Sequence, residues 1–160
     1  MACRKRIKYF LTLVQEKSFC QNIYIKRMKK KISLQVKCPH CRESLMDEEH
    51  LLNDYPSIRL NIVTPEDRGI INLCSLFECF DHTENIDIKT NTIVDFYCPK
   101  CNQELTVKEE CKLCGAPMVS FVLKAGGRVS ICSRKGCSNH YLTFQDLTQE
   151  LSRFYNEYEL

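Results

Sequence analysis

The sequence predicts a small, mainly β fold with β-hairpins and a C-terminal α-helix, stabilised by bound metal rather than by a large core. Three observations indicate this fold class. The chain of 160 residues contains 12 cysteines, and ten of these fall into five close pairs. Short stretches in which apolar and polar residues alternate, as in strands, lie beside the pairs. The basic N-terminus lacks the features of a secretory signal. Paired cysteines in such a chain more often bind metal than form disulfides.

Residues 1–31 are interpreted as a basic N-terminal tail. Residues 1–37 carry eleven Lys and Arg and one acidic residue, a net charge of +10. Residues 38–160 carry twelve Lys and Arg and nineteen acidic residues, a net charge of −7. The apolar stretch at 9–14 is shorter than the ~7–15 residues of a secretory core. No apolar run approaches the ~20 residues that span a bilayer. We therefore expect a cytoplasmic protein without a membrane association.

A first zinc ribbon with an inserted β-hairpin is expected over residues 32–106. Apolar and polar residues alternate before the first cysteine pair and again further on, which is typical of strands. A turn signal at 64–69, with Pro, Asp and Gly, joins two of these strands into the inserted hairpin. The expected elements are a strand over 32–37, a short helix or loop over 42–53, strands over 57–63 and 70–80, and a strand over 92–97.

A second zinc ribbon is expected over residues 107–142, followed by a helix in 143–160. The strands at 118–123 and 128–132 flank a Lys-Ala-Gly-Gly turn, in which glycine supplies positive φ angles. In the last segment, apolar residues recur at i, i+3 and i+4 spacing. Thr143 with Asp146 three residues later suits a helix N-cap. The spacing predicts a helix over 145–158 that packs against the domain.

The cysteine pairs predict two closed metal sites. A CxxC pair after a strand forms a tight knuckle whose two sulfurs face one ion, and structural zinc takes four such ligands. Five pairs make two sites and leave one pair over. We expect Cys74 and Cys79 to be the spare pair, because no Pro or Gly near them favours a knuckle and free cysteine behaves as a small buried hydrophobe. In chain order the pairs are Cys38/Cys41, Cys74/Cys79, Cys98/Cys101, Cys111/Cys114 and Cys132/Cys137.

The hairpin over 118–132 indicates how the pairs combine. It returns the fifth pair beside the fourth, which gives the spacing CxxC-x17-CxxxxC. The first pair then joins the third across 56 residues. In the alternative, Cys98/Cys101 joins Cys111/Cys114 across nine residues. Cys38/Cys41 then joins Cys74/Cys79, and Cys132/Cys137 has no partner pair. His140 is expected at the surface or beside a site. The expected ligands of two structural zinc ions are Cys38, Cys41, Cys98, Cys101, Cys111, Cys114, Cys132 and Cys137.

Residues 111–137 resemble the C-terminal zinc ribbons of type IA DNA topoisomerases. The shared features are a CxxCG knuckle, a hairpin with a glycine turn and a second cysteine pair directly after it. The arrangement over 38–140 is also similar to small bacterial proteins with tandem zinc ribbons. Topoisomerase ribbons bind single-stranded DNA through basic and aromatic side chains. The resemblance therefore implies nucleic-acid contacts through Phe121, Lys124, Arg128, Arg134 and Lys135.

The favoured hypothesis for function is a non-catalytic zinc-binding module for a protein or nucleic-acid partner. Four thiolates leave no open position on a tetrahedral ion, and no HExxH or GxSxG motif is present. We expect no small-molecule substrate. Two alternatives remain. One is a thiol oxidoreductase that uses the CPHC motif at Cys38 and Cys41, activated by a following helix. The other is a rubredoxin-like iron electron carrier, because paired knuckles serve both metals.

Overall fold

The computed structural model describes residues 31–143 and residue 156. The chain divides into two compact units, Met1–Lys31 and Ile32–Leu160, and all described strands belong to the second. The helix expected over 145–158 lies outside the described residues except for position 156. Residues 31–143 contain no helix. Among the residues that the structure describes, no helix is long and apolar enough to cross a membrane.

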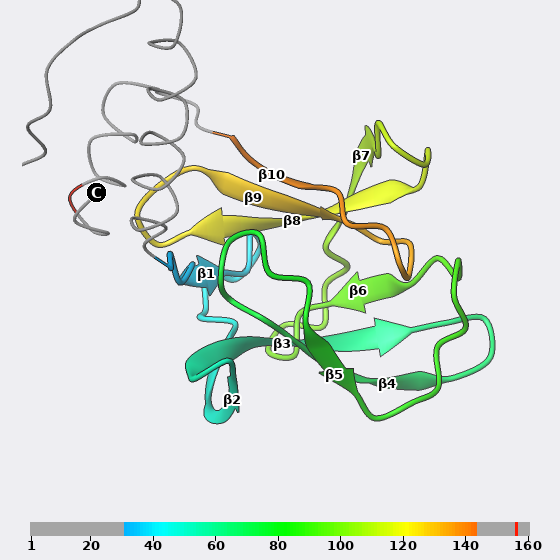
Figure 1. Ribbon diagram of the computed structural model, residues 1–160, viewed down its shortest axis with the longest axis horizontal. Helices are drawn as coiled ribbons and strands as arrows, with labels where there is room; N and C mark the ends of the chain where they lie inside the picture. Colours follow the sequence, from blue (N-terminus) through cyan, green and yellow to red (C-terminus); the bar gives the residue numbers. More distant parts are fainter. Residues whose placement is uncertain (1–30, 144–155, 157–160) are drawn as a thin grey trace, which may run out of the picture. The chain divides into compact units, whose positions relative to one another are not determined.

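The strands over residues 31–143 form two antiparallel sheets, so the mainly β prediction is confirmed (Figure 1). One sheet has the order β1-β8-β9-β10, with β7 also pairing with β8. The other has the order β2-β3-β4-β5, with β6 also pairing with β3. The strands are β1 (Val36–Lys37), β2 (Met46–Leu52), β3 (Tyr55–Val63), β4 (Arg68–Leu73), β5 (His82–Glu84), β6 (Asp95–Tyr97), β7 (Thr106–Glu110), β8 (Pro117–Leu123), β9 (Arg128–Cys132) and β10 (His140–Thr143).

Two local predictions are wrong. Within the segment 42–53, expected to be a short helix or a loop, residues 46–52 form β2, an edge strand paired with β3. The strand expected over 70–80 ends at Leu73, and a loop follows from Cys74. Pairing overrides local preference in both cases, because strand propensity depends mainly on neighbours and burial. Residues 46–52 pair with the adjoining strand β3, and the loop after Leu73 bonds instead to the backbone of Ile32 and Leu34.

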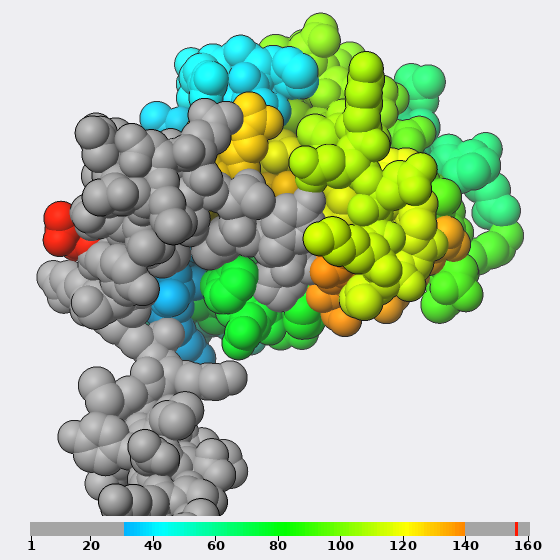
Figure 2. Space-filling model, turned by 90° about the horizontal axis from the view of Figure 1, so that it is seen from above, coloured from blue at the N-terminus to red at the C-terminus, as the bar shows by residue number. Residues whose placement is uncertain are grey.

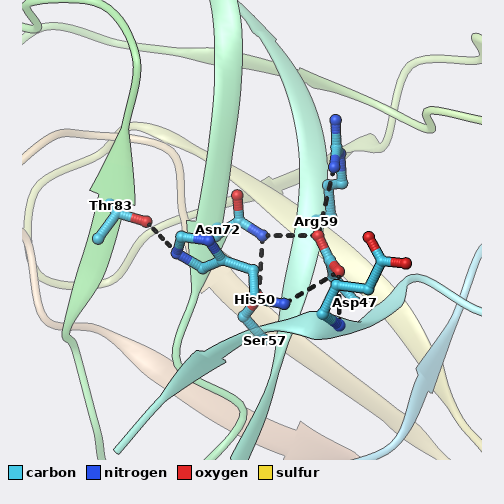
Figure 3. Close-up of polar contacts among 7 residues, drawn as sticks. Asp47, His50, Ser57, Arg59, Asn72 and Thr83 are labelled. Atoms are coloured by element: carbon cyan, nitrogen blue, oxygen red, sulfur yellow. Dashed lines mark hydrogen bonds and ion pairs between the residues drawn. The ribbon is translucent and has the colours of Figure 1, made fainter.

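A polar cluster attaches the acidic strand β2 to its sheet (Figure 3). Asp47 Oδ2 accepts hydrogen bonds from Arg59 Nη1 and Asn72 Nδ2, both at 3.3 Å, and Asp47 Oδ1 accepts from the backbone N–H of His50 at 3.2 Å. Asn72 Nδ2 also donates to Ser57 Oγ at 2.8 Å, and both side chains are buried. Hydrogen bonding is what allows these polar groups to be buried.

The two sheets are built from two halves of the chain with the same strand order. We call residues 32–84 the first repeat and residues 92–143 the second repeat. The antiparallel pairs β2–β3, β3–β4 and β4–β5 of the first have counterparts β7–β8, β8–β9 and β9–β10 in the second. The leading strands exchange partners: β1 pairs with β8, and β6 pairs with β3. Each sheet therefore contains strands from both repeats.

Backbone hydrogen bonds outside the strands follow the same repeat. Each repeat has a loop after its fourth strand, which is β4 in the first repeat and β9 in the second. The backbone of this loop forms hydrogen bonds with the segment that precedes the first strand of the repeat, β1 or β6. The matched bonds to that segment, donor first, are Leu34–Ser75 with Val94–Ser133 and Phe77–Ile32 with Lys135–Thr92. A third matched pair, Cys74–Asp81 with Cys132–Asn139, lies within the loops themselves. The chain thus contains an internal structural duplication that reaches into its loops.

One apolar core contains residues from both repeats. Leu60 of β3 and its counterpart Phe121 of β8 are almost fully buried, as is Val36 of β1. They belong to a single cluster that also contains Cys38 and Cys98. Full burial of a large apolar side chain stabilises the fold by roughly 1.5–3 kcal/mol. The cysteines at the ends of the exchanged strands are therefore part of the main core.

Candidate metal centres

The first cysteine group lies where the repeats exchange strands, and we call it the exchange site: Cys38, Cys41, Cys98 and Cys101. Their four sulfurs all lie within 4.8 Å of one another. Cys38 Sγ is 3.8 Å from Cys101 Sγ, and Cys41 Sγ is 3.8 Å from Cys98 Sγ. Each repeat thus contributes one knuckle, and the two knuckles meet in a reciprocal arrangement.

The knuckles have matching local structures. In the first, the N–H of Arg42 donates to the carbonyl of Cys38 at 3.1 Å, and Arg42 has a φ of 65°. The N–H of His40 donates to Cys38 Sγ at 3.3 Å. Such N–H groups stabilise a thiolate. The second knuckle repeats these features at Cys98, Lys100 and Asn102.

The second group lies within the second repeat, and we call it the second-repeat site: Cys111, Cys114, Cys132 and Cys137. Its sulfurs also lie within 4.8 Å of one another. The Sγ atoms of Cys111 and Cys137 are 3.8 Å apart, and those of Cys114 and Cys132 are 3.4 Å apart. The β8–β9 hairpin brings the two pairs together, and Figure 2 shows their loops side by side, in yellow-green and orange.

Both groups fit one tetrahedral ion. Zinc–sulfur bonds of about 2.3 Å place the corners of a tetrahedron about 3.8 Å apart. Three of the four separations given above are 3.8 Å and the fourth is 3.4 Å. Four thiolates in this geometry suit zinc or iron. Cys38 and Cys98 are 0% exposed, so a cation is needed to stabilise thiolates there.

The thiol pKa values show how burial and hydrogen bonding act on the sulfurs. Burial raises the pKa of Cys38 to about 12 and also raises the pKa of Cys132. Burial also acts to raise the pKa of Cys111, but hydrogen bonds from the Asn139 amide and the backbone N–H of Leu113 lower this pKa to about 6. The Asn139 Nδ2 to Cys111 Sγ distance is 3.2 Å. A divalent cation would favour the thiolate form at every ligand, so metal binding releases protons.

The structure groups the cysteines as the hairpin argument expected. The alternative that joins the third and fourth pairs is wrong, because those pairs lie in different groups. The CPHC motif is followed by strand β2 and not by a helix, which removes the helix that the oxidoreductase alternative required. The backbone of His140, the first residue of β10, pairs with that of Ile131 in β9.

The spare pair occupies a loop equivalent to the one that carries Cys132 and Cys137 of the second-repeat site. Cys74 and Cys79 have the same CxxxxC spacing as Cys132 and Cys137. Glu78, with a φ of 63°, takes the left-handed conformation that Gly136 takes in the second repeat, with a φ of 91°. The absence of glycine therefore did not prevent this loop, and the shared spacing was the sequence signal for it. A cavity of about 210 Å³ adjoins both loops.

The basic residues implied by the topoisomerase resemblance are divided between the two ends of the β8–β9 hairpin. Lys124 and Arg128 flank its glycine turn, whereas Arg134 and Lys135 follow β9. At ~3.3 Å per residue these ends are about 15 Å apart. The Lys135 ammonium also forms an ion pair with the Glu84 carboxylate of the first repeat. These four residues therefore do not form one compact basic patch.

No protein-family model matches the chain, and no curated protein or solved structure matches it either. The topoisomerase resemblance thus remains a prediction. The structure itself defines a mainly β protein with two four-cysteine groups that fit zinc-ribbon-like sites.

Proposed function

We propose that the chain is a non-catalytic, cytoplasmic zinc-binding module whose two structural zinc ions hold a surface for a protein or nucleic-acid partner. The main support for this proposal is that each four-cysteine group offers four sulfur ligands to a single ion. Four thiolates saturate a tetrahedral zinc ion, so no position remains for water or substrate. At the exchange site the ion would bind both repeats at once, and folding and metal binding would therefore be linked.

Elemental analysis of the purified full chain tests the metal content, with zinc and iron measured together. The expected result with as-isolated protein is two tightly held zinc ions per chain. The variant Cys3→Ser/Cys20→Ser, which changes cysteines outside both groups, should retain both. Fewer than two ions per chain would contradict the proposal. One iron per chain with a visible absorption band would instead favour the electron-carrier alternative.

For the partner, the charge balance favours a protein over a nucleic acid. Residues 38–160 carry a net charge of −7, which opposes binding to phosphate. Titration of single-stranded DNA at low and high salt decides between them. Affinity that falls steeply with salt, and that Lys124→Ala/Arg128→Ala lowers, would favour a nucleic-acid partner. No binding at low salt would support a protein partner.

A further inference from the structure

The first repeat has a counterpart of the second-repeat site that retains half of its cysteines. Cys74 directly follows β4 and Cys132 is the last residue of β9. The two correspond, because the N–H of each donates to the residue seven positions on. These acceptors are the carbonyls of Asp81 and Asn139, at 2.8 and 3.0 Å. Asp81 therefore stands where the second repeat has Asn139, the residue whose amide donates to a metal-site sulfur. The replacement adds a carboxylate beside the thiols.

The other half of the site differs because the loop that supplies it differs. In the second repeat, the six residues 111–116 between β7 and β8 carry two ligands. In the first repeat, β2 and β3 are joined by only Asn53 and Asp54, with φ angles of 54° and 70°. These angles are typical of a type I′ hairpin turn. This turn has no room for a knuckle, and the Asn53 side chain reaches the cysteines instead.

The amide nitrogen of Asn53 lies among three potential metal-ligand atoms. Asn53 Nδ2 is 3.5 Å from Cys74 Sγ, 3.3 Å from Cys79 Sγ and 2.9 Å from Asp81 Oδ2. Cys79 Sγ and Asp81 Oδ2 are themselves 3.6 Å apart. An amide NH₂ has two hydrogens and cannot donate one to each of three acceptors. Two sulfurs and a carboxylate around one point form a ligand set for a thiophilic divalent cation.

We propose that Cys74, Cys79 and Asp81 form a third metal site, which binds a thiophilic divalent cation such as Zn²⁺ in place of the Asn53 amide nitrogen. Rotation of this amide would turn its oxygen towards the ion as a fourth ligand, or a water molecule would complete the coordination. The sulfurs would have to approach by about 1 Å to reach zinc–sulfur bond lengths. Asn53 and Asp81 are exposed, so the amide has room to rotate and the carboxylate has room to approach the ion.

The third site differs from the two four-cysteine sites in having an open side. Asp81 is exposed, whereas every cysteine of the two four-cysteine groups is buried or half-buried. A site with two thiolates and solvent access exchanges its ion more readily than a closed structural site. The site is therefore suited to taking up and releasing zinc, a role beyond that of the structural ions.

Equilibrium dialysis of the zinc-loaded full chain tests the site. The chain is dialysed with a reductant against excess Zn²⁺, and bound metal per chain is measured. The expected result is three ions for the natural sequence and two for Cys74→Ser/Cys79→Ser. Asp81→Asn, which introduces the residue of the second repeat at an exposed position, should also reduce three ions to two. Because this variant leaves both cysteines in place, it separates loss of the site from loss of the fold.

The control Cys3→Ser/Cys20→Ser removes two thiols elsewhere and should still bind three ions. If the natural sequence binds two ions, or if either first-repeat variant keeps the third, the inference is overturned. A third ion lost only in the Cys3→Ser/Cys20→Ser control would also overturn it. Fewer than two ions in the natural sequence would contradict the proposed function, so the two failures are distinguishable.

Discussion

The two repeats have the same strand order and pairing, yet only the second forms a four-cysteine group on its own within the described residues. Both have the CxxxxC loop after the fourth strand. The second repeat adds the knuckle of Cys111 and Cys114, and the first has the turn of Asn53 and Asp54 in its place. One loop between two strands thus decides whether a repeat closes its own site. The strand framework alone does not require that site.

The exchange site belongs to neither repeat alone, because each repeat contributes two of its four cysteines. Its ligands are in the main core cluster or pack against it, whereas Cys111 and Cys132 belong to a small separate cluster with Ala116 and Met118. Loss of the exchange-site ion should therefore affect the whole described fold. Loss of the second-repeat ion should act locally.

The largest effect is expected for Cys98→Ser. It removes a fully buried ligand from the exchange site and should destabilise the chain by more than about 4 kcal/mol, as expected when a structural metal is lost from a core. Thermal unfolding followed by circular dichroism, with metal analysis, measures this. Cys74→Ser serves as the control and should keep both structural ions. A Cys98→Ser chain that unfolds at the same temperature as the natural sequence would contradict the central role of this site.

A smaller, local effect is expected for Cys114→Ser. The chain should lose one of its two structural zinc ions, because three thiolates no longer close the second-repeat site. Hydrogen exchange should rise in 111–116 and 132–139 while β3 and β4 stay protected. Equal loss of protection in both sheets would show that the two sites stabilise the fold as one unit.

Asp47→Asn should lower the free energy of unfolding by about 1–2 kcal/mol at neutral pH, because it weakens hydrogen bonds to a charged acceptor. Burial acts to raise the pKa of Asp47, but hydrogen bonds from Glu49, Asn72, His50 and Arg59 lower it overall. The carboxylate therefore stabilises the fold above its unfolded pKa of ~3.9, and this contribution is lost as pH falls through the folded value.

Urea unfolding of Asp47→Asn and the natural sequence at several pH values measures this contribution. The difference in unfolding free energy should shrink as the pH falls below about 4. Val107→Ala, at the corresponding position of the second repeat, provides a control without a titrating group. A difference that does not depend on pH would contradict the role assigned to the Asp47 carboxylate.

The smallest effect is expected at the shared left-handed position of the two CxxxxC loops. Gly136→Ala should cost about 1 kcal/mol, because an L-residue is strained at this φ. The new Cβ would be 3.6 Å from Thr90, an ordinary contact, so the cost comes from the backbone. Glu78→Ala in the first repeat introduces no new backbone strain and should have less effect in urea unfolding. A larger loss at Glu78 would show that its side chain, and not the backbone, stabilises that loop.

The sequence was sufficient for the features that depend on neighbouring residues. Alternating residues predicted the strand at 57–63, because side chains in a strand have a period of two. The glycine turn after Lys124 predicted the hairpin that brings the last two cysteine pairs together. The domain boundaries, the partner and the cytoplasmic location remain predictions.

Tertiary structure decided the features that depend on which strands pair. Strands β2 and β7 are acidic edge strands without clear alternation, and they form because β3 and β8 offer them hydrogen bonds. The exchange of β1 and β6 between the sheets places Cys38 opposite Cys101. No local stretch encodes this exchange, since each exchanged strand pairs with a strand of the other repeat. The cysteine spacing indicated that paired knuckles form, and the strand exchange determined which knuckles meet.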